Sequence, residues 1–77
     1  MMAQIRNHDL TDIEKEIIIQ MADCDLRLGE VAKQINYCRG AVYYHVKRIF
    51  KKTGLNPRSF YDLLILIDIV KGVNDYD

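Results

Sequence analysis

Residues 31–53 read VAKQINYCRGAVYYHVKRIFKKT, and this stretch decides the fold that the sequence predicts. Asn36 lies between two segments that suit helices, and asparagine is one of the few residues besides glycine that readily adopts a positive φ. Ala32, four residues earlier, supplies the small side chain that two closely crossing helices require. Val42, six residues after Asn36, is placed to anchor the second helix in a core. The stretch therefore predicts a helix-turn-helix unit, in which two helices are joined by a tight turn.

Positive charge is concentrated on this unit. Seven basic residues and no Asp or Glu lie between Val31 and Arg58, whereas residues 1–30 carry three basic and seven acidic side chains. The chain as a whole has a formal net charge of zero. A solvated lysine face is common on helices, but it does not account for this separation of the two signs along the chain. The separation predicts one positive face, and a helix-turn-helix unit places its second helix in the major groove of duplex DNA.

Helix start and stop signals divide the chain into four expected helices. Thr11 and Glu14 have the spacing of a capping box, in which each side chain bonds the backbone N–H of the other. Gly54 and Gly72 follow helical patterns at positions where glycine ends a helix. Pro57 separates the third helix from the fourth. The expected helices are residues 11–22, 29–35, 39–53 and 60–71, so the predicted fold class is all-α.

A chain of 77 residues suits one small domain, whose core is near the lower limit for independent stability. We expect a flexible N-terminal arm at residues 1–9, a helix-turn-helix DNA-binding domain at residues 10–73 and a C-terminal tail at residues 74–77. No apolar run suits a signal peptide or a membrane span, since the longest, residues 63–67, is far too short. We therefore expect a cytoplasmic protein with no membrane partner.

The sequence contains no arrangement that suits catalysis or metal binding. Cys24 and Cys38 lack the CxxC or histidine spacing of a zinc site. Neither His8 nor His45 has a Ser, Cys or carboxylate at a spacing that suggests catalysis, and no glycine-rich phosphate loop is present. We therefore expect no metal, no cofactor and no enzymatic activity.

The fourth expected helix is apolar on two sides. The face expected to pack against the domain holds Phe60, Leu63, Leu64, Ile67 and Val70. The other side holds Ile65, Leu66 and Ile69. One apolar face is enough for packing in a small domain, so the second side predicts a partner. We expect a homodimer in which Ile65, Leu66 and Ile69 pair around a two-fold axis, with this helix as the C-terminal dimerisation helix.

Several short motifs follow one another in a fixed order along the chain. They are Leu10-Thr11 with Glu14 and Glu16, then Ala32, then Val42 with His45, then Ile49 and Lys51 to Leu55. In this order they resemble the DNA-binding domain of LuxR-type regulators. Two further motifs, Tyr44-His45 and Gly54 to Pro57, make the sequence resemble more closely the C-terminal helix-turn-helix of PucR-type transcription factors. The resemblance covers residues 10–70 and implies a small transcriptional regulator.

The resemblance implies that Tyr43, Tyr44 and Lys47 occupy the positions that read bases in the groove. For Tyr44, partial burial remains an equal alternative. Arg39 and Gly40 begin the third helix, where backbone N–H groups suit a phosphate. The other candidates for phosphate contact are basic residues of the positive stretch, namely Lys33, Arg48, Lys51, Lys52 and Arg58.

A second class of function remains open. Ala41 stands where both families usually carry Thr, which removes one expected phosphate contact, and the net charge is zero. The alternative is a protein-interaction adaptor that keeps the same fold but binds RNA polymerase or another regulator. Salt-dependent binding to duplex DNA separates the two functions, because contacts with phosphates release counterions.

Overall fold

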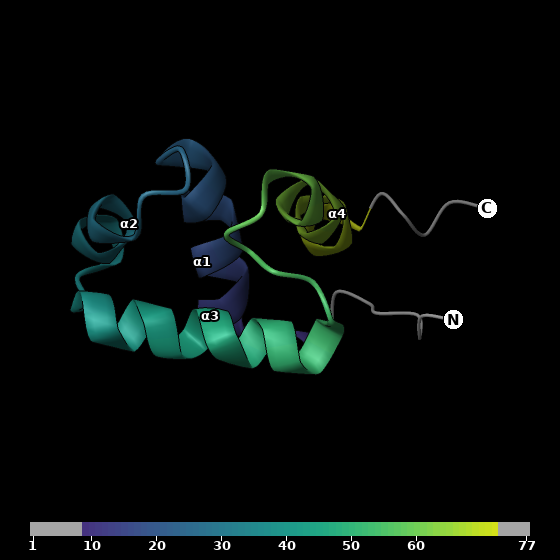
Figure 1. The fold of residues 1–77 in the computed structure, drawn as a ribbon, viewed down its shortest axis with the longest axis horizontal. Coiled ribbons are helices and arrows are strands. Elements are labelled where there is room, and N and C mark those ends of the chain that lie inside the picture. The colour runs from purple at the N-terminus through teal and green to yellow at the C-terminus, as the bar shows by residue number, and fades with distance from the viewer. Residues whose placement is uncertain (1–8, 73–77) are drawn as a thin grey trace.

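The computed structural model describes residues 9–72, which form four α-helices and no β-strand (Figure 1). The helices are α1 (Asp12–Asp23), α2 (Leu28–Ile35), α3 (Arg39–Thr53) and α4 (Phe60–Lys71). This confirms the all-α class and the four expected helices, whose predicted bounds differ by no more than one residue. The expected tail lies outside the described residues, and so does the expected arm apart from Asp9. Within residues 9–72, no helix is both long and apolar enough to cross a membrane.

The start of α1 is the predicted capping box. The Thr11 hydroxyl accepts a hydrogen bond from the Glu14 backbone N–H at 3.2 Å, and the Glu14 carboxylate accepts one from the Thr11 N–H at 3.0 Å. These bonds satisfy two N–H groups that a helix N-terminus otherwise leaves unpaired. After α1, Asp25 and Leu26 both adopt positive φ, and the Leu26 N–H donates to the Met21 carbonyl. Leucine at positive φ is uncommon, whereas aspartate is a residue type that suits a turn.

The connection between α2 and α3 is the turn predicted at Asn36. Asn36 has φ 62° and ψ 42°, in the left-handed region. The Tyr37 N–H donates to the Ala32 carbonyl at 2.9 Å, and the Asn36 N–H donates to the Lys33 carbonyl at 3.3 Å. This pair of bonds is the Schellman arrangement, which satisfies the last carbonyls of a helix and reverses the chain.

The helix α1 is the centre of the domain, since it packs against α2, α3 and α4, and α2 also packs against α3. In Figure 1, α3 lies along one edge of the molecule, below α1 and α2. Each helix contributes apolar side chains to a single core. The core residues are Leu10, Ile17, Ile18, Met21, Val31, Ala32, Val42, Val46, Ile49, Leu55, Leu63, Leu66 and Ile69.

The orientation of α4 differs from the one predicted. Leu66 and Ile69 are buried in the core of the single chain, so the prediction that they form an outer dimerisation face is wrong. Ile65 is exposed as predicted, but Phe60 and Leu64, which were expected to pack inward, are also exposed. The pattern of an almost wholly apolar helix does not select which side is buried.

The loop between α3 and α4 is attached to the core and to the first turn of α4. Leu55 and Pro57 are buried, and the Asn56 N–H donates to the Asp62 carboxylate at 2.9 Å. These contacts hold the first turn of α4 in one orientation against the core. Leu63, Leu66 and Ile69 therefore face inward.

Candidate nucleic-acid interface

The outer side of α3 carries the side chains that were predicted to read DNA. Val42, Val46 and Ile49 are buried, so the helical period leaves Tyr43 and Lys47 on the opposite side. Tyr43 is 43% exposed and Tyr44 is 57% exposed, so neither ring is part of the buried core. Lys47 and Lys51 are exposed one and two turns beyond Tyr43. One exposed strip of α3 therefore combines aromatic rings with positive charge.

This strip borders a surface groove to which the α3–α4 loop also contributes. The groove is lined by Tyr43, Tyr44, Val46, Lys47, Arg48, Phe50, Lys51, Asn56 and Arg58. Cations lie against the rings. The Lys47 ammonium is 5.5 Å and the Arg58 guanidinium 5.8 Å from the centroid of the Tyr43 ring, and the Arg48 guanidinium is 5.9 Å from that of Tyr44. Cation–π attraction at these distances orders long side chains that would otherwise move freely.

Phe50 and Asn56 line the groove although the sequence analysis did not select them. Phe50 is exposed, although the adjacent Ile49 is buried in the core. Phe50 follows Tyr43 by seven residues, or about two helical turns, and this spacing places both residues on one face. That signal was present in the sequence.

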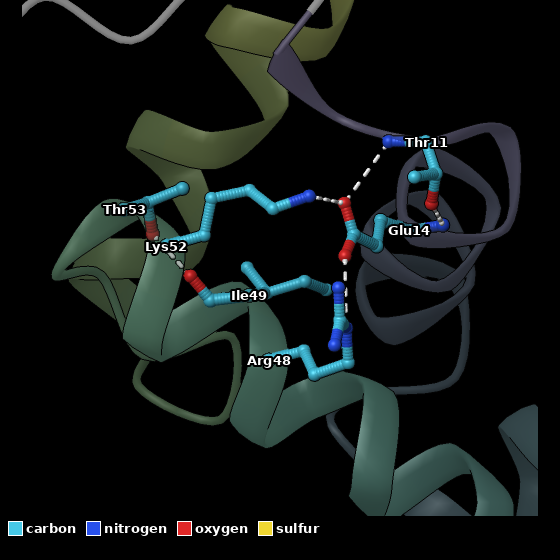
Figure 2. A network of polar contacts seen from close by, with 6 residues as sticks. All are labelled: Thr11, Glu14, Arg48, Ile49, Lys52 and Thr53. Carbon is cyan, nitrogen blue, oxygen red and sulfur yellow. Dashed lines mark hydrogen bonds and ion pairs between the residues drawn. The ribbon is translucent and has the colours of Figure 1, made fainter.

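Glu14 of α1 reaches two of the predicted phosphate-binding residues (Figure 2). Its carboxylate is buried, with only 1% of the residue exposed. The Lys52 ammonium donates to Glu14 Oε1 at 2.6 Å, and Arg48 Nε lies 4.0 Å from Glu14 Oε2. Burial raises the pKa of the Glu14 carboxyl, but the hydrogen bonds from Lys52 and Thr11 outweigh this effect. The net pKa lies below its ordinary value.

The ion pair gives Lys52 a structural partner inside the protein. Its side chain is only 28% exposed, whereas that of Arg48 is 52% exposed and the residue also lines the groove. An ammonium held by a buried carboxylate is not available to a DNA phosphate without breaking that pair. The structure therefore separates Lys52 from the exposed cations of α3.

Three further candidates lie outside the groove lining. Lys33 is exposed and forms an ion pair with Glu30 at 3.6 Å. The Arg39 side chain lies beside Gly29 of α2, where an added Cβ would be 3.8 Å from Arg39 Cδ and Nε. Gly40 is exposed, with open space where a Cβ would be. These residues flank the turn between α2 and α3 without joining the groove.

His45 packs between aromatic rings on α3 and at the end of α2. Its ring makes edge contacts with Tyr44 at 5.3 Å and with Tyr37 at 6.1 Å. His45 Nδ1 is buried and has no hydrogen-bond partner within the described residues. The imidazole is therefore a packing group beside the candidate interface.

Comparisons of this chain with protein-family models, with curated proteins and with solved structures found no match. The resemblance to LuxR-type and PucR-type domains therefore remains a prediction. It rests on the order of the motifs.

Proposed function

We propose that this chain is a helix-turn-helix domain that binds duplex DNA sequence-specifically as a small transcriptional regulator, with α3 in the major groove. The observation that carries the proposal is the exposed strip of α3, where Tyr43, Lys47 and Lys51 lie opposite the buried anchors. An α-helix with its side chains is about 10–12 Å in diameter, and the major groove, about 12 Å wide, accommodates such a helix.

Tyr43, Tyr44 and Lys47 are the proposed base-reading residues. A tyrosine hydroxyl donates to or accepts from a base edge, and its ring packs on a thymine methyl group. A lysine ammonium donates to guanine O6 and N7. Their exposure and their place on one side of α3 support this role.

The proposed phosphate contacts surround these three residues. Lys51, Arg48 and Arg58 line the same groove, and phosphate contacts of this kind fix the register of a protein on DNA. The turn between α2 and α3 adds Lys33, Arg39 and Gly40. Lys52 is left out of the set because its ammonium is held by Glu14.

A homodimer through α4 remains part of the proposal, with a revised set of residues. Phe60 is 60% and Tyr61 76% exposed, and Leu64 and Ile65 are exposed beside them. Fully burying one such side chain contributes about 1.5–3 kcal/mol, so two copies of this patch supply enough apolar area to offset the cost of association. Pairing of α4 with α4 of a second copy is closed and two-fold symmetric.

The test is a mobility-shift titration on a duplex obtained by binding-site selection, at two salt concentrations. Lys47→Ala with Lys51→Ala should weaken binding, and loss of the Lys51 phosphate contact should lower the slope of log affinity against log salt by about one, since each phosphate-neutralising cation contributes about 0.9. Lys15→Ala with Lys71→Ala is the matched control, because it removes the same charge from α1 and α4. Equal affinity of the two folded double variants would contradict the proposal.

The exposed apolar patch of α4 favours a second function, the adaptor that binds RNA polymerase or another regulator. Phe60, Tyr61, Leu64 and Ile65 offer a surface for a different protein as well as for a second copy. An adaptor would bind no duplex in a salt-dependent manner. The same titration therefore decides between the two functions.

A further inference from the structure

We propose that the α3–α4 loop makes a second contact with DNA, in which Arg58 binds a backbone phosphate beside the base pair that Tyr43 and Lys47 read. In this arrangement Asn56 and Asp62 are positioning residues that hold the loop. The inference rests on the proposed binding of duplex DNA. It specifies where the proposed Arg58 contact lies and assigns a role to an acidic residue on α4.

Arg58 belongs to the loop after α3, yet its side chain reaches Tyr43 on the exposed strip of α3. Its guanidinium and the Lys47 ammonium both lie within 6 Å of the centroid of the Tyr43 ring. Two cations that approach one ring repel each other, and an anion bound beside them relieves this repulsion. A phosphate diester is the DNA group with that charge, and the planar guanidinium matches its two oxygens.

The beginning of the loop is anchored to the end of α3. The Thr53 hydroxyl donates to the Ile49 carbonyl at 2.7 Å and accepts from the Leu55 N–H at 3.0 Å. Leu55 and Pro57 are both buried. Since these residues lie on either side of Asn56, the loop backbone is pinned to the core directly before Arg58.

Asn56 and Asp62 fix the rest of the loop. The Asn56 side-chain oxygen accepts from the Arg58 N–H at 3.0 Å, and the Asn56 carbonyl accepts from the Ser59 N–H at 2.9 Å. The Asn56 N–H in turn donates to Asp62 Oδ2 at 2.9 Å. Ser59 makes no side-chain cap to α4, so the Asp62 carboxylate serves the loop in place of a capping box.

These bonds fix the backbone position from which the Arg58 side chain extends. A loop that is already ordered loses less conformational entropy when its arginine binds a phosphate than a mobile loop does. Asp62 carries a negative charge, however, and lies in the first turn of α4, directly after a loop that would face DNA. Its long-range electrostatic effect opposes DNA binding, whereas its hydrogen bond supports it. The two effects have opposite signs, so they can be separated by mutation.

Asp62→Ala and Asp62→Asn make this separation, because both remove the charge and only Asp62→Asn keeps an acceptor oxygen for the Asn56 N–H. We expect Asp62→Asn to bind the selected duplex at least as tightly as the wild type. Asp62→Ala should bind about threefold to tenfold more weakly than Asp62→Asn, as expected when a charged contact is misplaced. Circular dichroism and thermal melting establish that both variants are folded. Equal affinities of the two variants would overturn the role of Asp62.

Arg58→Ala tests the phosphate contact itself. It should weaken binding to selected and random duplexes by the same factor and lower the salt slope by about one. A methylphosphonate replacing the contacted phosphate should weaken the wild type but leave Arg58→Ala unchanged. In Asp62→Ala, the additional effect of Arg58→Ala should be smaller than in the wild type.

The outcomes distinguish this inference from the proposed function. If the wild type binds the duplex and Arg58→Ala binds it equally well, the loop contact is wrong while DNA binding by α3 stands. If no methylphosphonate position separates the wild type from Arg58→Ala, Arg58 does not contact a single phosphate. If the wild type binds no duplex at either salt concentration, the proposed DNA binding and the Arg58 contact are both wrong.

Discussion

Glu14 shows how one residue does two tasks at the junction of two helices. It completes the capping box with Thr11 at the start of α1, and it accepts a hydrogen bond from the ammonium of Lys52 in the last turn of α3. A buried carboxylate is unfavourable unless it is paired and hydrogen-bonded, and both conditions are met here. The contact joins residues 38 positions apart in the chain and connects α3, which carries the candidate interface, to α1.

The net lowered pKa of Glu14 leads to a prediction about stability and pH. The folded state holds this carboxylate ionised to a lower pH than the unfolded chain does, so its contribution is fully present above the ordinary pKa of 4.5 and is lost as pH falls through the lowered value. At pH 7, Glu14→Gln should lower the free energy of unfolding by about 1–3 kcal/mol. Urea unfolding from pH 7 downward should show the difference from the wild type shrinking below pH 4.5.

The exposed Glu16 on the same helix provides the control. Glu16→Gln removes the same charge but no buried ion pair, so its free energy of unfolding should stay within about 0.5 kcal/mol of the wild type across the range. A pH-independent gap between Glu14→Gln and the wild type would show that the carboxylate's charge contributes nothing.

At the scale of the helices, α3 and α4 differ in how clearly their sequences divide the inside from the outside. In α3 one apolar stripe faces the core, and polar and aromatic residues fill the rest. In α4 apolar residues lie all round, and the structure alone separates the buried Leu66 from the exposed Leu64 and Ile65. A charge introduced at the exposed positions of α4 should therefore leave the domain folded, whereas a charge at the buried position should unfold it.

Leu64→Glu with Ile65→Glu should give a folded monomer, because these side chains are exposed in the single chain and the charges would repel across a two-fold interface. Leu66→Glu should unfold the domain instead, since it buries an unpaired carboxylate in the core. Sedimentation measures the mass of each variant and circular dichroism its helix content. A wild type that stays monomeric at high concentration, with and without DNA, would contradict the dimer.

On the scale of the whole molecule, the signs of charge are separated in space as well as in sequence. The helix α3, which lies along one edge of the molecule (Figure 1), and the loop after it carry basic residues and no acidic ones, whereas the charged residues of α1 are mostly acidic. Glu14 neutralises part of the α3 charge from inside. A dimer through α4 would carry two such edges, which DNA-binding dimers place about 34 Å apart on one face of the duplex.

The dimer predicts a spacing requirement in the DNA. Two inverted half-sites with centres about 10 base pairs apart should bind more tightly than the same half-sites with five base pairs inserted, because the insertion turns one half-site to the opposite face. Mobility-shift titrations of the two duplexes and of a single half-site measure this difference. The same affinity per half-site in all three duplexes would mean that the copies bind independently.

Interactions within a few residues of one another were predictable from the sequence. The capping box at Thr11, the left-handed Asn36 and the glycines that end α3 and α4 each depend on bonds inside one turn of chain, so the residue type and spacing suffice. The exposed face of α3 was also predictable, because a helix with a single apolar stripe turns that stripe toward the core.

Contacts between distant segments were decided only by the tertiary structure. The rotation of α4 about its own axis, the pairing of Glu14 with Lys52 and the approach of Arg58 to Tyr43 all depend on how helices and loops pack against α1 and α3. A nearly uniform apolar helix such as α4 gains similar burial from several rotations, so its pattern does not choose among them. In the structure, α4 packs against α1, and the loop before it is held by the buried Leu55 and Pro57 and by the hydrogen bond from Asn56 to Asp62.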